Sequence, residues 1–330
     1  MQIRPILTLC AASLLVLTTV YASTNAAAES LASNLYVVQN DPSTGAGSVL
    51  QFPANGQSST RPGSMTPSTL LAIPTLLNAV TTDASGNLFV SGTVTNSPGT
   101  YEVTEYSVPS SGTATQIRTL TNMSAVASAM TVDANGQLYT VNGSSISVFA
   151  ASATGSTAPT RLIAGANTLL NAPTAIAVDA AGNIYVANAE AGNVLVFSAT
   201  ATGNVSPTRT IAGTTTGIVQ PWGVAVDASG DLFVTTSGIA PALAAKILEF
   251  TPGATGDVAP IQTIDVVAPN VASGIAVDAQ GNLYTSLTNA STLQLSVGVY
   301  APGAKGNVAP AQTFTASAWT ATQDAQIAVY

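Results

Sequence analysis

Carboxylate side chains outside the repeated parts of the sequence are the first candidates for chemistry. Three of them lie in loops next to expected strands: Asp41, Glu190 and Asp324. Carboxylate and amide oxygens are the ligands that Ca²⁺ and Mg²⁺ prefer in proteins. The three acids come from distant parts of the chain and lack the spacing of a metal-binding motif. A Ca²⁺ or Mg²⁺ site therefore remains a hypothesis, and the sequence otherwise predicts no cofactor and assigns no metal ligand.

The two tryptophans, Trp222 and Trp319, are the next candidates, because each lies just before an expected strand. An indole in such a place can stack on a sugar or another flat ligand. It can also pack as a plug over the mouth of a channel, a purely structural role. The sequence favours the plug and keeps ligand stacking as the alternative.

Aspartate recurs along the chain in steps of 50, 46, 48 and 51 residues, at Asp83, Asp133, Asp179, Asp227 and Asp278. Each one begins the pattern Asp-Ala-x-Gly, followed by Asn, Asp or Gln. An Asp carboxylate can accept a backbone N–H two residues on, and Gly supplies the positive φ that closes a tight turn. We therefore interpret the five aspartates as turn-formers and not as catalytic acids.

A short apolar strand precedes each of these turns, and three more follow, so that one unit holds four strands in about fifty residues. Such strands are apolar on both faces and must be covered on both faces. Stacked blades of a β-propeller meet that demand. An Arg or Gln recurs in the fourth, outermost strand and is expected to reach solvent or to bridge neighbouring blades: Arg118, Arg161, Arg209, Gln262 and Gln312.

The two ends of the chain carry complementary fragments of this unit. Residues 34–38 match a second strand with no first strand before it, and residues 327–330 match a first strand with nothing after it. Pairing of the two would complete a sixth blade and leave no exposed sheet edge. The sequence thus predicts an all-β, six-bladed propeller of four-stranded antiparallel blades, closed by terminal strands that share one blade.

Composition excludes several classes of function. Only 7% of the 330 residues are charged, the formal net charge is −8, and there is no histidine. A nucleic-acid-binding protein would carry a basic surface, so nucleic acid is not expected as a partner. Without histidine a Ser-His-Asp triad cannot form. The sequence also contains no second long apolar run that could span a membrane.

The N-terminus has the pattern of an export signal. Arg4 precedes an apolar run over residues 6–20, and small residues follow at Ala22 and Ala28. We predict a signal peptide over residues 1–28, cleaved after Ala22 or Ala28, and a single propeller domain over residues 29–330. The mature chain would therefore be secreted or periplasmic. The only cysteine, Cys10, lies in the removed segment, so the mature chain would be free of disulfides.

The repeat Ile-Ala-Val-Asp-x-x-Gly-Asn-Ile-Tyr-Val, with Asn188 and Val194-Leu195-Val196-Phe197 downstream, resembles NHL-repeat propellers. It is also similar to the group of SMP-30/gluconolactonase-like and virginiamycin B lyase-like proteins. The lyases of this group use active-site histidines, which this chain lacks. The lactonase-like members hold a divalent metal through Glu, Asn and Asp, and no motif here carries those ligands over residue by residue. The resemblance implies the fold and leaves the activity open.

Ligand sites in propellers are expected in the loops of one face, around the central channel. The candidates in those loops are Asp41, Asn188, Glu190, Trp222, Trp319 and Asp324. No catalytic residue is assigned. The sequence favours an exported, monomeric, non-enzymatic propeller that binds an unidentified extracellular ligand or protein, or serves as a structural envelope module. The alternative is a metal-dependent, lactonase-like hydrolase with its site at the channel mouth.

Overall fold

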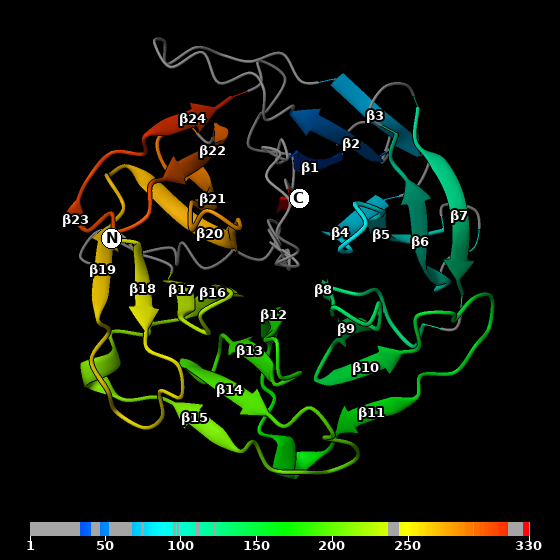
Figure 1. The fold of residues 1–330 in the computed structure, drawn as a ribbon, viewed down its shortest axis with the longest axis horizontal. Helices are drawn as coiled ribbons and strands as arrows, with labels where there is room; N and C mark the ends of the chain where they lie inside the picture. The colour runs from blue at the N-terminus through cyan, green and yellow to red at the C-terminus, as the bar shows by residue number, and fades with distance from the viewer. Residues whose placement is uncertain are drawn as a thin grey trace, which may run out of the picture.

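A computed structural model describes residues 34–40, 47–52, 68–73, 76–94, 97, 99–109, 113–121, 123–236, 244–292, 294–315 and 326–329. The described strands form six sheets arranged as blades around a central axis (Figure 1). The prediction of an all-β, six-bladed propeller with four antiparallel strands in each blade is therefore confirmed. The expected signal peptide, Asp41, Trp319, Asp324 and Tyr330 lie outside the described residues.

The strands of each blade are ordered from the axis to the rim. Blade 1 contains β25 (Gln326–Val329), β1 (Leu35–Asn40), β2 (Gly47–Phe52) and β3 (Ser68–Ile73). Blade 2 contains β4 (Leu76–Thr82), β5 (Leu88–Thr93), β6 (Tyr101–Ser107) and β7 (Thr115–Leu120). Blade 3 contains β8 (Ala129–Val132), β9 (Leu138–Asn142), β10 (Ser145–Phe149) and β11 (Arg161–Ala164).

The remaining blades follow the same order. Blade 4 contains β12 (Pro173–Val178), β13 (Ile184–Asn188), β14 (Asn193–Phe197) and β15 (Arg209–Ile211). Blade 5 contains β16 (Pro221–Val226), β17 (Leu232–Thr236), β18 (Lys246–Phe250), β19 (Gln262–Asp265) and, from the next blade's loop, β23 (Gly306–Asn307). Blade 6 contains β20 (Asn270–Val277), β21 (Leu283–Asn289), β22 (Leu295–Tyr300) and β24 (Gln312–Phe314). Two 3-10 helices, η3 (Ala166–Thr168) and η4 (Thr214–Thr216), lie in the links into blades 4 and 5.

The two chain ends close the ring as the sequence predicts. β25 pairs antiparallel with β1, with Val329 opposite Leu35 and Ile327 opposite Val37. β25 also contacts the inner strands of blades 2 and 6, so the six inner strands form a closed circle. β25 begins at Gln326, just before the predicted segment 327–330, and β1 extends to Asn40, past the predicted segment 34–38.

Hydrophobic side chains fill the spaces between neighbouring blades. Every residue of β12 and β13 is buried, and so is every residue of β14 after Asn193. This burial is expected for strands covered on both faces. One cluster joins blades 3 and 4, another joins blades 4 and 5, and the largest spans the closure from blade 5 through blades 6 and 1 to blade 2. Within that cluster the Phe52 and Phe314 rings lie 5.6 Å apart across the seam between blades 1 and 6.

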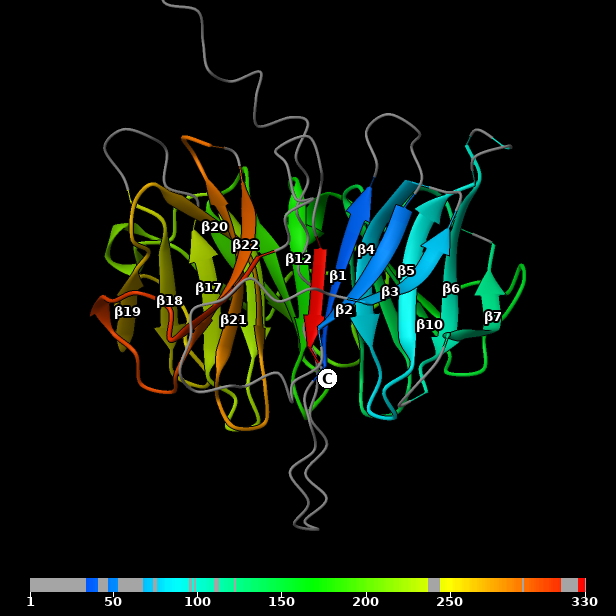
Figure 2. The ribbon, with the colours of Figure 1, turned by 90° about the horizontal axis from the view of Figure 1, so that it is seen from above.

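The ring has two different faces, seen from the side in Figure 2. The turns that join first to second strands all lie on one face, at the lower edge of this view; we call it the turn face. The described loops that join second to third strands, and the described links into the inner strands, lie on the opposite face, which we call the loop face. In the described residues, no helix has the length and apolar character that crossing a bilayer requires.

The repeated aspartates form the turns of the turn face. The Asp179 Oδ1 atom accepts the backbone N–H groups of Ala181 (2.9 Å) and Asn183 (2.8 Å), and its Oδ2 accepts the Asn183 side-chain amide (2.8 Å). The Tyr185 hydroxyl donates to the same Oδ2 at 3.2 Å. The other four aspartates accept the same two backbone N–H groups. Their interpretation as turn-formers is confirmed, because each carboxylate accepts two backbone N–H groups of its own turn.

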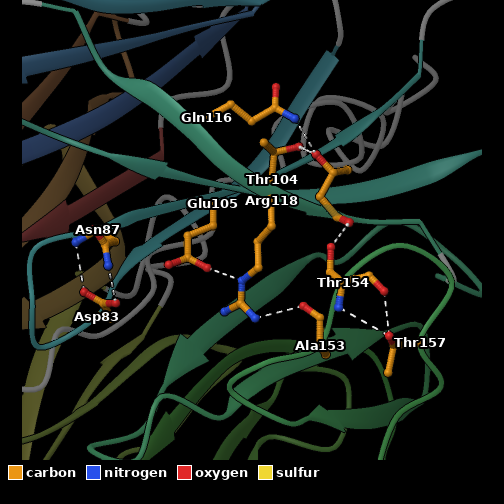
Figure 3. A network of polar contacts seen from close by, with 10 residues as sticks. Asp83, Asn87, Thr104, Glu105, Gln116, Arg118, Ala153, Thr154 and Thr157 are labelled. Carbon is orange, nitrogen blue, oxygen red and sulfur yellow. Dashed lines mark hydrogen bonds and ion pairs between the residues drawn. The ribbon is translucent and has the colours of Figure 1, made fainter.

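The Arg and Gln side chains of the fourth strands bridge neighbouring blades. Arg209 donates to the Tyr185 hydroxyl of its own blade (2.9 Å) and to the Ala254 carbonyl of the next one (3.1 Å). Figure 3 shows the same arrangement in blade 2, where Arg118 pairs with Glu105 and reaches the Ala153 carbonyl of blade 3 at 2.8 Å. Gln262 reaches the Ala304 carbonyl at 2.8 Å. Of the two expectations for this position, bridging is the one that the structure supports.

Candidate ligand-binding site on the loop face

The loop-face end of the inner strands carries a set of β-bulges. Pairing between first and second strands skips one residue in blades 2, 4 and 5 and two residues in blade 6. A bulge bends a strand and redirects the side chain of the extra residue, and bulges are frequent next to functional sites. The skipped residues lie around the axis: Asn78, Thr174, Trp222, Ser273 and Gly274.

A bulge can take a backbone N–H out of the ladder between strands, and a buried N–H without another acceptor is destabilising. In blade 5 the Gly223 N–H donates to the Thr235 hydroxyl at 2.8 Å, and that hydroxyl donates to the Ser273 carbonyl of blade 6. In blade 2 the Ser91 hydroxyl accepts from Ala79 and donates to the Ala127 carbonyl of blade 3, both at 2.9 Å. The bulges are therefore held rigidly and tied to the neighbouring blade.

Blade 4 achieves the same connection from a different residue. Its second strand has Ala187 where blades 2 and 5 have a hydroxyl, and Thr174 on the bulge itself donates to the Pro221 carbonyl of blade 5 at 2.9 Å. Gly223 follows Trp222, and a Cβ added there would lie 2.7 Å from the Ser273 carbonyl oxygen. Only glycine permits this approach of the two inner strands. The backbone on both sides of Trp222 is thus fixed by its neighbours.

Trp222 is the bulged residue of β16 and is partly exposed, between the buried residues Pro221 and Gly223. The link that leads to it contains Gln220, whose φ of 43° is unusual for a residue with a side chain. Strained backbone of this kind is found preferentially at ligand-binding sites. Trp222 lies at the loop-face end of the inner ring as the second residue of β16, whereas the sequence had placed it in the loop before that strand.

Asn188 is completely buried at the end of β13. Its Nδ2 donates to the Leu169 carbonyl and to the Asn193 Oδ1, both at 3.0 Å, and its Oδ1 accepts the Asn171 N–H at 2.6 Å. Both ends of the amide are therefore occupied in fastening the link into β12 to the β13–β14 hairpin. The structure gives Asn188 a positioning role below the loop-face surface, and its direct contact with a ligand stays a prediction that this arrangement does not favour.

Glu190 lies in the hairpin loop between β13 and β14 and is exposed. The loop is short and closed by a hydrogen bond from Gly192 to Ala189 (3.2 Å). A Cβ added at Gly192 would lie 4.0 Å from the Ile218 carbonyl oxygen, in the link that leads to Trp222. The loop of Glu190 and the link of Trp222 are thus neighbours at the seam between blades 4 and 5. Glu190 makes no hydrogen bond or ion pair with another described residue.

The described residues do not fit a metal centre. No group of three His, Cys, Asp or Glu side chains among them could hold a metal ion. Asp41 and Asp324, the other two acids of the metal hypothesis, lie outside the described residues, so that hypothesis stays a prediction together with the role of Trp319. Two other charged groups lie at the loop-face ends of third strands. Lys246 pairs with Asp265 toward the rim. Burial raises the pKa of the Glu102 carboxyl.

Sequence reasoning placed Glu190 and Trp222 on the face of the links into the inner strands, where their role at a ligand stays a prediction, and it missed the bulges. One signal was present: the position five residues before each repeat Asp varies in type, while most of the strand residues after it are small or aliphatic. That position holds Asn78, Ser128, Thr174, Trp222 and Ser273. The bulges themselves depend on hydroxyl groups of other strands, which a pattern along one strand does not reveal.

Comparisons with known proteins give the fold and a partial family likeness. A family model described as "Lactonase, 7-bladed beta-propeller" matches residues 88–221, from β5 to the start of β16. No curated protein matches the sequence. The NHL-repeat resemblance is therefore not confirmed, while the likeness to lactonase propellers is supported over this part of the chain.

Solved structures that resemble this chain include a gluconolactonase and a putative 6-phosphogluconolactonase. The periplasmic gluconolactonase PpgL of Pseudomonas aeruginosa is 17% identical, with a TM-score of 0.56 over 82% of this chain and 80% of that one. A putative 6-phosphogluconolactonase of Bacteroides uniformis is 14% identical, with a TM-score of 0.55 over 86% and 83%. A chain of a nidogen/laminin complex is 15% identical, with a TM-score of 0.57 over 90% and 98%. The chain is a six-bladed β-propeller that is similar to lactonase propellers over residues 88–221.

Proposed function

We propose that the chain is a propeller that binds a small sugar-like ligand on its loop face, at the seam between blades 4 and 5. The observation that carries this proposal is the bulged placement of Trp222, held by hydrogen bonds of both neighbouring residues, at the end of a link that lies beside the loop of Glu190. An aromatic ring offers a stacking surface for the apolar face of a sugar, and a carboxylate accepts hydrogen bonds from its hydroxyl groups. Binding needs no catalytic group, in keeping with the non-enzymatic interpretation of the sequence.

The surroundings of Trp222 support this ligand class. The bulge residues near it are neutral and polar, and the link residue Val219 adds an exposed aliphatic side chain (38% exposed). Pockets for small ligands combine apolar walls with a few fixed polar groups. The rigid hydrogen bonds around Thr174 and Thr235 reduce the ordering that binding would require.

Hydrolysis of a lactone is the second candidate, favoured by the family model that matches residues 88–221 and by the resemblance to two lactonase structures. The chain has no histidine, and a carboxylate is a general base that the loop face offers. Glu190 is the described loop-face carboxylate in the proposed site, where it could activate water directly. The residues described give no basis for a step through a metal ion.

One experiment separates the two candidates. The mature chain is mixed with glucono-1,5-lactone, glucose and galactose, and unfolding temperature and acid release from the lactone are measured. Binding without catalysis predicts a higher unfolding temperature that is lost in Trp222→Ala, with acid release equal to the spontaneous rate. Faster acid release that is lost in Glu190→Gln would favour the hydrolase. The proposed function would be contradicted if none of the three compounds raised the unfolding temperature and acid release from the lactone stayed at the spontaneous rate.

We also propose export of the mature chain, supported by the signal-like pattern of residues 1–28. Expression of the full chain in a bacterium, followed by fractionation and determination of the N-terminus, tests this. Export predicts a chain in the periplasm or medium that begins at Ser23 or Glu29. An intact N-terminus in the cytoplasm would contradict it.

A further inference from the structure

Basic side chains are missing from the described part of the loop-face site, although one of the structures that resemble this chain is described as a putative phosphogluconolactonase. We infer that the site takes uncharged polyhydroxy ligands and discriminates against their phosphorylated forms. This inference rests on the proposed function and adds the charge of the ligand to it. It follows from three observations: the positions of the basic residues, the state of the backbone N–H groups, and the charge of Glu190.

The chain has seven basic residues, and the structure describes five of them. Arg118, Arg161 and Arg209 lie on outermost strands and donate to carbonyl groups of the next blade. Lys305 is exposed in the loop after β22, which leaves that strand on the turn face. Phosphate recognition normally relies on Arg or Lys at the ligand. None of these four residues lies at the proposed site.

The fifth described basic residue, Lys246, lies on the loop face but is already paired. Its ammonium contacts the Asp265 carboxylate, and the two side chains are 37% and 39% exposed. At the distance of the inner ring, the opposite charges of Lys246 and Asp265 largely cancel. Lys246 begins β18, the third strand of blade 5, whereas Trp222 lies on the innermost strand. A ligand phosphate at the axis would therefore gain little from it.

Backbone N–H groups can replace basic side chains in binding phosphate, provided that several of them are unpaired. In the link into blade 4 the five consecutive N–H groups of residues 167–171 are all used inside the chain. The acceptors are the Asn204 side chain, the Gly165 and Ala166 carbonyls, the Thr168 hydroxyl and the Asn188 side chain. In the link into blade 5, which leads to Trp222, the N–H groups of Thr215, Thr216 and Ile218 are also used inside the chain. Neither link therefore presents a run of unpaired N–H groups that could cradle an anion.

Electrostatic repulsion acts in the same direction. Glu190 is exposed at the seam, and the formal net charge of the chain is −8. A phosphate monoester carries nearly two negative charges at neutral pH. Two like charges about 4 Å apart repel by roughly 1 kcal/mol in water and by more at a partly desolvated surface. The phosphorylated ligand thus meets an unfavourable field with no compensating cation among the described residues.

Paired sugars that differ only in a phosphate test the inference directly. Glucose, glucose 6-phosphate, galactose and galactose 6-phosphate are titrated calorimetrically into the mature chain and into Glu190→Gln, Glu190→Arg and Arg61→Gln. We expect each phosphorylated sugar to bind at least about tenfold more weakly than its neutral partner. We expect Glu190→Gln to reduce this difference and Glu190→Arg to reverse it. Arg61→Gln, which changes a basic residue outside the described residues, is expected to leave it unchanged.

The outcomes distinguish the inference from the proposed function. Equal or tighter binding of a phosphorylated sugar by the unaltered chain would overturn the inference and leave the proposed function intact. If Arg61→Gln removed that binding, the missing cation would be identified. If none of the four sugars binds, the proposed function is overturned, and the inference falls with it. A difference that Glu190→Arg does not alter would also overturn the inference, because the discrimination would then arise elsewhere.

Discussion

At the scale of single residues, Asp231 differs from its counterparts in other turns. Blades 2, 4 and 6 have Asn at this position, and its side-chain amide donates to the turn aspartate at 2.8 Å. Asp231 faces the Asp227 carboxylate without such a donor. Burial and then the Asp227 charge raise the pKa of Asp231, and burial followed by the Asp231 and Asp227 charges raises the pKa of Glu249.

The first prediction is that Asp231→Asn stabilises the protein by about 0.5–1 kcal/mol at pH 7, by removing repulsion and adding a hydrogen bond. A raised pKa means that the folded chain holds the proton more tightly than the unfolded chain. Stability from this cluster therefore increases as pH falls through the folded-state pKa values, until both states are protonated below the ordinary values. The gain from Asp231→Asn should accordingly be larger at pH 7 than at pH 4, in urea unfolding. A gain that grows toward pH 4 would contradict this assignment.

The second prediction concerns Thr82, the last residue of β4. Its hydroxyl is buried (1% exposed) and has no hydrogen-bond partner among the described residues. The equivalent positions hold valine: Val132, Val178, Val226, Val277 and Val329. Because a buried hydroxyl without a partner is destabilising, Thr82→Val should raise the free energy of unfolding by about 1 kcal/mol. Denaturant unfolding measures this change.

Thr235→Val is the matched control for the same substitution. The Thr235 hydroxyl accepts from Gly223 and donates to Ser273, so its loss leaves two buried groups unpaired. We expect a loss of about 1–3 kcal/mol. If both valine variants changed stability in the same direction, the hydrogen-bond assignment of one of them would be wrong.

Residue roles could be predicted where the repeat determines them. The turn aspartates were assigned correctly because Asp and Gly at fixed spacing have one common structural use. The burial of Asn188 could not be predicted, since its three partners lie in a link and a hairpin that meet only in the folded blade. The lack of a basic side chain in the described part of the seam likewise required the positions in space of the five described basic residues.

At the scale of elements, the four-strand unit and its order from axis to rim followed from the period and from the aromatic residues at regular positions. The bulges and the links did not. η3 and η4 each receive a side chain from the next blade, because Asn204 accepts the Asn167 N–H and Asp257 accepts the Thr215 N–H, both at 2.7 Å. Such contacts depend on the stacking of neighbouring blades and leave little pattern in either segment alone.

The third prediction tests the bridges between blades. Arg209→Ala removes the hydrogen bond to Ala254 and the contact of the guanidinium with the Tyr185 ring, which lies 5.4 Å from it. We expect a loss of about 1–3 kcal/mol in denaturant unfolding. Arg209→Gln copies blade 5, where Gln262 keeps the carbonyl contact, and should lose less. Equal losses in the two variants would show that bridging to the next blade is not what stabilises this position.

At the scale of the whole molecule, the sequence predicted the closure because two incomplete fragments of the repeat stand at the chain ends. β25 covers the inner edge of β1, where Leu35 and Val37 are buried. The shape of the loop face was less predictable, because its links differ from blade to blade and carry the residues that the repeat does not specify.

The fourth prediction concerns this closure. A chain that ends at residue 325 lacks β25 and leaves β1 with an unpaired inner edge. Full burial of an aliphatic side chain is worth about 1.5–3 kcal/mol, so exposure of several of them should lower the unfolding temperature sharply. Differential scanning calorimetry measures the shift. A truncated chain that unfolds at the temperature of the full chain would contradict the closed ring.

The most direct test of the central claim, that the seam of blades 4 and 5 on the loop face binds the ligand, is hydrogen exchange with and without a saturating neutral sugar. The account predicts slower exchange of backbone N–H groups in residues 189–192 and 217–222, with the turns at residues 179–183 and 227–231 unchanged. Protection confined to the turn face, or to the loop face of other blades, would contradict it.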